Sequence, residues 1–390
     1  MISFDNTEIA FKSKSTADLT RAYWLFKIIG NPSLVKFGKW ATNTALNLHL
    51  PIKGIIKKTI FSQFCGGETI SDCTKAINTL SNFGIGTILD YSIEGKTSDE
   101  DFNATVEEII ATIKAAAGNT KIPFAVFKVT GISSFSILEK ANDSNAILTN
   151  EEQVKLTAII QRIDKICAAA HENNVPVFID AEETWIQDTI DRITFDMMLK
   201  YNKERAIIYN TLQLYRHDRI AFLKEEVTKA KIHNIHYGVK LVRGAYMEKE
   251  RDRALKMGYP SPIQPDKTAC DKDFNLALEL IIENLDAMAL CSGSHNEESA
   301  QLLAQLMLQK GIAPADKRIY FAQLLGMSDH ISYNMAHAGY NVAKYVPYGP
   351  VKEVMPYLLR RADENTSVAG QTSRELSLIM KERNRRKDLN

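Results

Sequence analysis

The sequence has almost no net charge and no apolar run that approaches the length of a transmembrane helix. Its 390 residues include 48 lysines and arginines and 47 aspartates and glutamates, which gives a formal net charge of +1. Because phosphate binding requires a cationic surface, this balance argues against nucleic acid as the main partner. The N-terminus carries Asp5 and Glu8 and lacks a continuous apolar region, so no secretory signal peptide is predicted. We therefore expect a chain that is soluble or at most peripheral to a membrane.

Cysteine is also scarce, and the five cysteines are widely spaced. They form no Cys-x-x-Cys pair, and their odd number leaves at least one without a disulfide partner. This pattern indicates reduced thiols, not a disulfide framework or a zinc site, and it predicts a cytoplasmic location. The histidines do not suggest a metal site either, since His330 and His337 fall on one predicted helix without a third ligand.

Helix and strand signals divide the chain into three parts. Residues 1–84 are predicted to be helical, with a capping box at Ser15-x-x-Asp18 and a first long helix that Gly30 ends. Over residues 85–370, short apolar strands alternate with amphipathic helices, which predicts a closed (βα)8 barrel of the α/β class. The predicted strands are Thr87–Tyr91, Phe124–Val129, Val175–Asp180, Ala206–Leu212, Gly238–Val242, Ala287–Cys291, Ile319–Ala322 and Tyr340–Tyr345.

The third part, residues 371–390, is a basic C-terminal tail. It combines the apolar residues Leu376, Leu378 and Ile379 with a run of cations that begins at Lys381. The plainer interpretation is a terminal helix surrounded by solvent. The alternative is a basic contact with a membrane surface, which would make the protein peripheral to an inner membrane.

Polar side chains gather at the predicted carboxyl ends of the strands, where packing alone would favour apolar residues. In barrels of this class, the functional groups lie at that edge. We therefore expect a barrel enzyme that binds an anionic ligand. The polar residues in question are Lys128, Asp180, Gln213, Lys240, Arg243, Ser294, His295 and Asn296.

Two short stretches carry the strongest functional signal. The first, Lys-Leu-Val-Arg-Gly-Ala-Tyr from Lys240 to Tyr246, is an apolar strand with two cations that ends in a glycine and an aromatic residue. The second, Tyr-Leu-Leu-Arg-Arg-Ala-Asp-Glu-Asn, places Arg360, Arg361 and Glu364 at i, i+1 and i+4 of a predicted helix. At this spacing the glutamate can brace both guanidinium groups, and paired arginines suit the capture of a small carboxylate.

Both stretches resemble the proline dehydrogenases, and matching blocks run in the same order from about Ser62 to Asn365. The resemblance implies oxidation of L-proline to pyrroline-5-carboxylate, with hydride transfer from proline C5 to N5 of FAD. A quinone is the implied electron acceptor. Bifunctional relatives carry a fused aldehyde dehydrogenase domain for which 390 residues leave no room, so a separate pyrroline-5-carboxylate dehydrogenase is also implied.

The resemblance also implies which residues meet the substrate. Lys128 and Asp180 would lie beside it and pair with each other, and Lys240 would join them in catalysis. Tyr345 favours proline, since hydroxyproline-preferring relatives tend to carry a smaller residue at that position. The other implied substrate residues are the carboxylate clamp with its partner, Arg360, Arg361 and Glu364, and two further residues that wall the proline ring, Tyr246 and Leu324.

A second set of residues is implied to hold the flavin. Cations near the isoalloxazine ring favour the reduced, anionic flavin. Many bacterial members read Arg-Leu-Val-Lys where this chain has Lys-Leu-Val-Arg, the order of mitochondrial members, so it stays open which cation faces the flavin N5. The implied flavin residues are Ala181, Gln213, Lys240, Arg243, Gly244, Ala245, Ser294 and His295.

Two other enzymatic hypotheses remain. The first is oxidation of hydroxyproline. The second is a Schiff-base aldolase or lyase that uses Lys128 as its nucleophile and the arginine pair to hold a carboxylate or phosphate. A barrel scaffold without activity is hard to reconcile with so many polar residues at the strand ends. A bound flavin that proline reduces would count against the aldolase and against the inactive scaffold.

Overall fold

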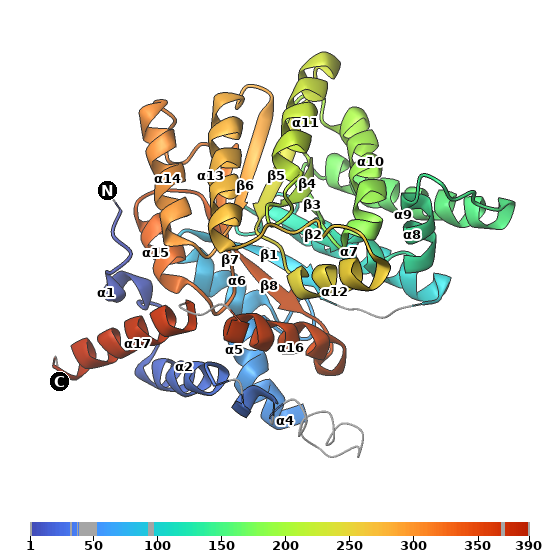
Figure 1. Ribbon diagram of the computed structural model, residues 1–390. Coiled ribbons are helices and arrows are strands. Elements are labelled where there is room, and N and C mark those ends of the chain that lie inside the picture. The colour runs from blue at the N-terminus through green and yellow to red at the C-terminus, as the bar shows by residue number, and fades with distance from the viewer. Residues whose placement is uncertain are drawn as a thin grey trace. The chain divides into compact units, whose positions relative to one another are not determined.

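Eight parallel strands close into a barrel in sequence order, as the alternating pattern predicts (Figure 1). The computed structural model of the protein describes residues 2–31, 33–36, 38, 53–92, 97–367 and 371–388. All eight predicted strands are present, and their ends differ from the predicted ones by at most three residues. The strands are β1 Ile85–Tyr91, β2 Phe124–Lys128, β3 Val177–Asp180, β4 Ile208–Gln213, β5 Tyr237–Val242, β6 Met288–Gly293, β7 Ile319–Leu324 and β8 Val342–Tyr348.

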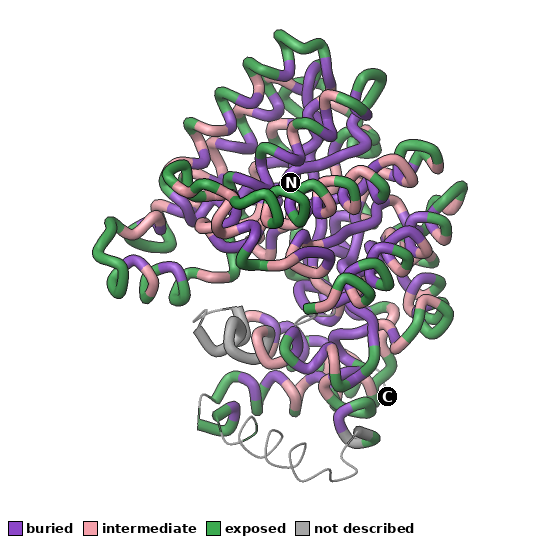
Figure 2. Tube along the Cα trace, turned by 90° about the vertical axis from the view of Figure 1, so that its right-hand side faces the viewer, coloured by how far each residue is buried: buried purple, intermediate pink, exposed green. Residues whose placement is uncertain are grey.

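Nearly all strand residues are buried, which explains why the strands are mostly apolar and do not alternate regularly with polar residues. In Figure 2 the buried residues run through the interior of the trace. Aromatic rings fill the amino-terminal part of the barrel. The rings of Phe124 and Phe178 stack with centroids 4.4 Å apart, and Phe124 also meets Tyr320 edge-on at 4.8 Å. Since β2 and β7 are not neighbours in the barrel, these rings lie in its interior.

A helix follows each strand, as the alternating pattern predicts. These helices are α7 Asp99–Ala116, α9 Asn150–Glu172, α10 Thr184–Tyr201, α11 Arg219–His233, α13 Lys267–Glu283, α14 Glu297–Gln309, α15 Asp329–His337 and α16 Val351–Ser367. Helices α8 (Phe135–Asn142) and α12 (Met247–Met257) and the short 3₁₀ helix η2 (Val129–Gly131) were not predicted. Helix α12 buries only Glu250 and Ala254, so its sequence lacks the stripe of several apolar residues that marks the other helices.

By its internal contacts the chain forms two compact units, which we call the terminal unit (Met1–Glu94 and Gln323–Asn390) and the central unit (Gly95–Ala322). The predicted boundaries at residues 84 and 370 stay predictions. The remaining helices belong to the terminal unit: α1 Thr7–Ala10, α2 Thr16–Ile29, α4 Lys53–Ile56, the π-helix η1 Lys57–Phe61, α5 Ser62–Phe64, α6 Thr74–Ser81 and α17 Gln371–Lys387.

The capping box that begins α2 is confirmed: the Ser15 hydroxyl accepts from the main-chain N–H of Asp18 at 3.1 Å, and Gly30 ends the helix. Helix α6 begins at Thr74, and just before it the Thr69 hydroxyl accepts from the Asp72 N–H at 3.2 Å. The second predicted helix, after residue 32, falls largely outside the described residues.

The C-terminal helix α17 packs against α1 and α2, and the three lie together in Figure 1. Leu378 and Ile379 join a buried cluster with Phe11, Leu19 and Phe26. The interpretation of α17 as a helix surrounded by solvent therefore holds only for its outer face, because its apolar residues are core residues of the terminal unit.

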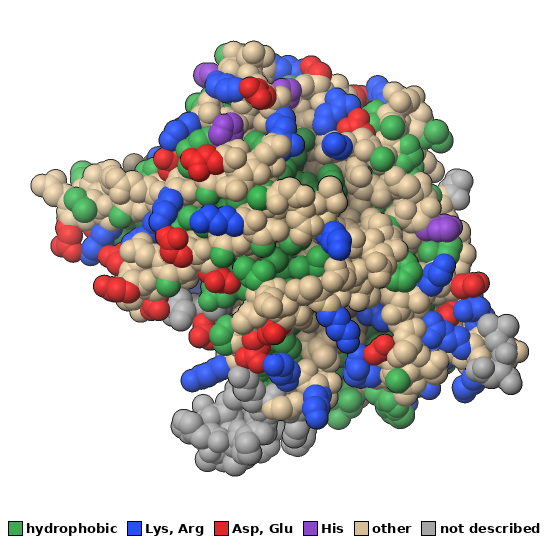
Figure 3. Space-filling view, turned by 180° about the vertical axis from the view of Figure 1, so that it is seen from behind, with side chains coloured by type: hydrophobic (Ala, Val, Ile, Leu, Met, Phe, Trp, Pro, Cys, Tyr) green, Lys and Arg blue, Asp and Glu red, His purple; other side chains and the backbone are tan. Residues whose placement is uncertain are grey.

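Charges of both signs are mixed on the surface seen in Figure 3, as the near-zero net charge implies. Across the part of the chain that the structure describes, no helix is long and apolar enough to cross a membrane. All five cysteines are buried and free. Burial raises the pKa of the Cys270 thiol to about 11 and that of Cys291 to about 12, so neither thiol is poised as a nucleophile.

Candidate active site

Three charged side chains meet at the carboxyl ends of β2, β3 and β5 in the central unit. Lys128 ends β2 in register with Asp180, which ends β3, and the Lys128 Nζ lies 3.5 Å from Asp180 Oδ2. The ammonium group of Lys240 donates to the other carboxylate oxygen, Oδ1. The structure thus brings the predicted Lys128–Asp180 pair together and adds Lys240 to it.

This lysine–aspartate–lysine cluster has an excess of positive charge. Burial alone would raise the pKa of Asp180, but Lys240 and Lys128 hold it below its ordinary value, so the carboxylate is ionised at neutral pH. Exposure is unequal: the Lys240 side chain is 4% exposed and that of Lys128 24%. The arrangement can therefore present the Lys128 ammonium to an anionic ligand while Lys240 stays fixed over the ring of Phe178, 5.2 Å from its centroid.

Arg243 follows β5 and is fixed on several sides. Its Nε donates to Asp271 of α13 at 2.6 Å, and its two terminal nitrogens donate to the hydroxyls of Ser294 at 2.7 Å and Ser299 at 3.0 Å. The guanidinium also lies over the ring of Phe274, 4.4 Å from its centroid. Held in this way, Arg243 is a preorganised cation at the end of the strand.

Ser294 and His295 lie in the turn between β6 and α14. The Ser294 N–H donates to the Ala322 carbonyl at 3.1 Å, and its hydroxyl also accepts from the Asn296 N–H at 3.1 Å. His295 is half-buried next to it. The predicted residues Arg243, Ser294 and His295 therefore lie together at one part of the strand ends.

The surroundings of position 244 require a glycine. It has a φ of +125°, and a Cβ atom at this position would come within 2.5 Å of the ring of Tyr215. Tyr215 is itself fixed, because its N–H donates to the Arg243 carbonyl at 2.7 Å and its carbonyl accepts from the Gln264 N–H at 2.6 Å. Gly244 and Ala245 are both exposed, so the backbone here is open to close approach by a ligand.

The segment after β3 is held by a buried glutamate. The carboxylate of Glu182 accepts from the Thr130 N–H at 2.9 Å and from the Thr130 hydroxyl, while the Glu182 carbonyl accepts from Gln213 Nε2 at 2.6 Å. Burial raises the pKa of Glu182 to about 7. Gln213 thus fixes the chain on the far side of Ala181, which is half-buried between Asp180 and Glu182.

Helix α12 ties this segment to the stretch that ends β5. Glu250 of α12 is buried, and its carboxylate accepts from the Thr184 N–H at 2.7 Å and the Thr184 hydroxyl at 2.6 Å, at the start of α10. Tyr246, half-buried, immediately precedes α12. The two loops that carry candidate residues are therefore linked by one short helix.

The remaining candidates belong to the terminal unit. Leu324 ends β7, and the next residue, Leu325, donates its N–H to the Tyr345 carbonyl on β8 at 2.8 Å. Tyr345 is buried, with 8% exposure. Arg360 is half-buried on α16. The backbone of α16 confirms the helical spacing of the arginines and the glutamate, but the side chains of Arg361 and Glu364 lie outside the described residues.

Sequence reasoning missed several residues that build the site. Glu182 could have been suspected, since it directly follows Asp180 and Ala181 in a polar run. Asp271 and Glu250 gave no signal, because each lies on a helix far in sequence from the partner that it binds.

The comparison with known families agrees with this geometry. The model of the proline dehydrogenase family matches residues 73–374, which include every candidate residue named above. The chain belongs to the proline dehydrogenase family.

The share of each related protein that aligns with this chain varies. Proline dehydrogenase 1, mitochondrial, of Dictyostelium discoideum is 34% identical, with 98% of this chain and 74% of that protein aligned. The human protein of the same name is 42% identical over 61% of this chain and 40% of its own length. A hydroxyproline dehydrogenase of Xenopus laevis is 31% identical over 96% of this chain and 88% of that protein.

Among solved structures, proline utilization A from Bdellovibrio bacteriovorus superposes with a TM-score of 0.73 at 19% identity, over 93% of this chain and 38% of that one. At this identity the likeness supports the barrel fold alone.

The relatives also overturn one prediction. A cytoplasmic location was expected from the cysteines, but the related proline dehydrogenases of Dictyostelium, human and Arabidopsis thaliana are named as mitochondrial.

Proposed function

We propose that the protein is an FAD-dependent enzyme that oxidises L-proline to pyrroline-5-carboxylate. The observation that carries the proposal is the cluster of Lys128, Asp180 and Lys240 at the strand ends, in a chain of the proline dehydrogenase family. Two cations around one buried carboxylate suit a substrate and a cofactor that are both anionic. A separate dehydrogenase would consume the product, and a quinone would take up the electrons.

The residues at the end of β5 fit a flavin dinucleotide. Gly244 and Ala245 expose small-residue backbone, beside a fixed guanidinium and the hydroxyl of Ser294. This donor set suits a phosphate-bearing cofactor, and we assign Ala181, Gln213 and His295 to the same site. Bound there, FAD would supply the acceptor at N5 for the hydride that leaves proline C5.

We assign different roles to the two cations at the end of β5, Lys240 and Arg243. Lys240 shares Asp180 with Lys128, a proposed substrate residue, so we assign Lys240 to the reacting end of the flavin. Arg243 pairs with Asp271 and Ser294, away from that cluster, and we assign it to the rest of the cofactor. Fixed positive charge at the reacting end stabilises the electron-rich reduced state without reorganisation.

The substrate would be held by its carboxylate and by its ring. We assign Arg360 and Arg361 to the carboxylate, with Glu364 bracing them, and Tyr246, Leu324 and Tyr345 to the ring. These residues need no proton transfer of their own if proline enters with a neutral amine, so positioning supplies most of their effect. The bulk of Tyr345 favours proline over hydroxyproline.

The Schiff-base alternative is disfavoured by the surroundings of Lys128. A lysine nucleophile must be a neutral amine, whereas the adjacent Asp180 carboxylate, 3.5 Å away, stabilises the ammonium form.

The deciding experiment is the visible spectrum of the purified protein during anaerobic addition of L-proline. Bleaching of a flavin band is the expected result. A flavin band that proline leaves unchanged, and that hydroxyproline bleaches, would replace the substrate. The absence of any flavin band after incubation with FAD would overturn the proposal.

A further inference from the structure

The loop between β7 and α15, residues 325–328, is anchored by a fully buried lysine that the proposed site does not use. The Lys344 ammonium on β8 donates to the main-chain oxygens of Leu324, at 3.2 Å, and Met327. It also pairs with the Asp329 carboxylate at 2.9 Å. These three acceptors occupy all three N–H donors of the lysine. Burial would raise the pKa of Asp329, but Lys344 and Lys14 hold it below its ordinary value, whereas burial lowers the pKa of Lys344 itself.

The C-terminal helix supplies a second anchor to the same loop. Glu375 of α17 is 2% exposed, and its carboxylate accepts from the main-chain N–H of Ser328. Ser328 has a φ of +49°, a conformation that a residue other than glycine keeps only where its surroundings hold it. Gln63 adds a third anchor, since its Nε2 donates to the Gly326 carbonyl at 3.0 Å.

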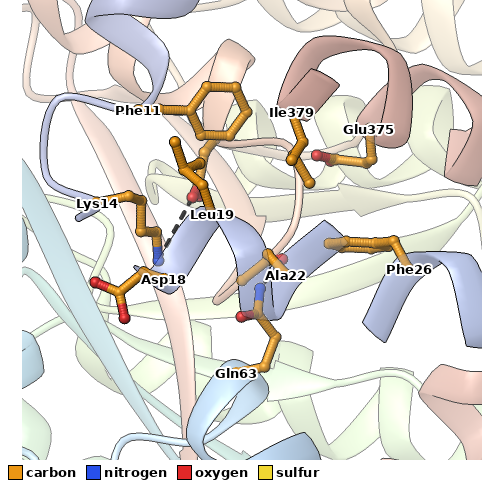
Figure 4. Close-up of a pocket in the computed structure, with 11 residues that line it drawn as sticks. Phe11, Lys14, Asp18, Leu19, Ala22, Phe26, Gln63, Glu375 and Ile379 are labelled. Atoms are coloured by element: carbon orange, nitrogen blue, oxygen red, sulfur yellow. Dashed lines mark hydrogen bonds and ion pairs between the residues drawn. The ribbon is translucent and has the colours of Figure 1, made fainter. Parts of the chain in front are cut away.

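Two of these anchors, Gln63 and Glu375, line a small cavity together with Gly326 of the loop. Its volume is about 10 Å³, room for roughly one water molecule. In Figure 4 the side chains of Lys14, Gln63 and Glu375 are directed into it. Removal of the Glu375 carboxylate takes from the Ser328 N–H the acceptor that ties the loop to α17, and a water molecule in the cavity would not restore that tie between the two segments.

We propose that Lys344 and Glu375 are positioning residues that set the place of Leu324 and Tyr345, and thereby the affinity for the ring of the substrate. The proposal rests on the proposed function, in which these two residues wall that ring. Tyr345 directly follows Lys344 on β8, and its carbonyl accepts from the N–H of Leu325, so strand and loop move as one. The C-terminal helix is then a part of the substrate site's support, through a residue that is not itself assigned to the substrate.

The test compares two buried glutamates of the same helix. Glu375→Ala removes the acceptor for the loop. The matched control, Glu382→Ala, removes a carboxylate whose side chain is 0% exposed and which pairs with Arg385 and Arg386 of α17 itself. Both variants lose a buried group, so both should lower stability, but only the first should disturb the loop.

For Glu375→Ala we expect the KM for proline to rise by between about 10-fold and about 100-fold, with a smaller change in kcat, because the ring wall moves while the reacting groups stay in place. Affinity for tetrahydrofuran-2-carboxylate, a ring carboxylate that has no amine to oxidise, should fall in parallel. Glu375→Gln keeps an acceptor oxygen and should restore both values. Glu382→Ala should leave both near the wild type.

The inference would be overturned if Glu375→Ala and Glu382→Ala changed the KM for proline and the affinity for the ring carboxylate equally. It would also be overturned if Glu375→Ala left both values unchanged. If Glu375→Ala does not fold, a thermal-shift titration of the ring carboxylate compares Lys344→Met with Glu382→Ala instead. Lys344→Met should bind the ring carboxylate more weakly than Glu382→Ala, and equal affinities would overturn the inference. A wild-type protein that binds the ring carboxylate without oxidising proline would overturn the proposed function instead, and the binding data would still compare the variants.

Discussion

Replacing Asp180 by asparagine should cost much of the protein's stability. The change leaves Lys240, whose side chain is 4% exposed, without its carboxylate. Removing one partner of a buried ion pair costs about 3–5 kcal/mol, whereas the partly exposed Lys128 should add little. We therefore expect Asp180→Asn to lower the free energy of unfolding by about 3 kcal/mol.

The assay is urea unfolding followed by circular dichroism, at the same saturating FAD concentration for every variant. The double variant Asp180→Asn/Lys240→Met removes the stranded cation as well, so it should be less destabilised than the sum of the two single variants, by about 1–3 kcal/mol. Asp271→Asn is the matched control: its carboxylate pairs with Arg243 and with Lys267, which is 65% exposed, so its loss should cost less.

The dependence on pH follows from the lowered pKa of Asp180. A carboxyl whose folded pKa is depressed stabilises the fold above its unfolded pKa, about 3.9, and loses that effect as the pH falls through the folded pKa. The gap between wild type and Asp180→Asn should hence be constant from neutral pH down to about pH 5 and shrink only in strong acid. A cost below about 1 kcal/mol, or additive single variants, would refute the reasoning.

Three further outcomes follow from the site. Arg360→Met should raise the KM for proline with little change in kcat, because the lost contact holds the substrate carboxylate; an unchanged KM would contradict the clamp. Glu182 has a folded pKa of about 7, above its ordinary 4.5. The wild type should therefore lose roughly 3 kcal/mol of unfolding free energy as the pH rises through that interval, and Glu182→Gln should not. The measurement is denaturant unfolding at several pH values, and unfolding free energies that change with pH equally in both proteins would argue against this. Gly244→Ala should bind less flavin than the wild type, measured by the flavin absorbance of the purified protein. Gly258→Ala is the control and should keep its flavin, because Gly258 also has a positive φ, +74°, but nothing lies within 4 Å of the added Cβ. Flavin retention by both variants would show that Gly244 has no special role.

The sequence predicted the barrel well, and for a physical reason. Strands buried on both faces are mostly apolar, and for β2 and β3 a polar residue at the carboxyl end, Lys128 or Asp180, marks where the apolar run stops. Helix α12 was missed because most of its residues are charged and only one of its apolar residues, Ala254, is buried. The partners of the candidate residues were missed for another reason: Asp271 lies 28 residues from Arg243, and Glu250 lies 66 residues from Thr184. Only the fold brings such pairs together.

The stretch from Lys240 to Arg243 explains why the order of its two cations matters. Arg243 lies one residue past the end of β5, where its carbonyl still accepts from the Tyr215 N–H, and an odd spacing along an extended chain puts the two side chains on opposite faces. Lys240 reaches Asp180 on β3, which is not a neighbour of β5, so it points into the barrel. Arg243 reaches residues of α13 and α14, so it points outward. A lysine is a compact point charge that one carboxylate can satisfy, and it suits the narrow interior. An arginine needs several acceptors in a plane, and the outer face supplies three. In a relative with the reverse order, the interior would have to satisfy a guanidinium instead. The two cations are thus matched to two surroundings, and exchanging them alone would leave an inner guanidinium short of acceptors and an outer ammonium with fewer contacts.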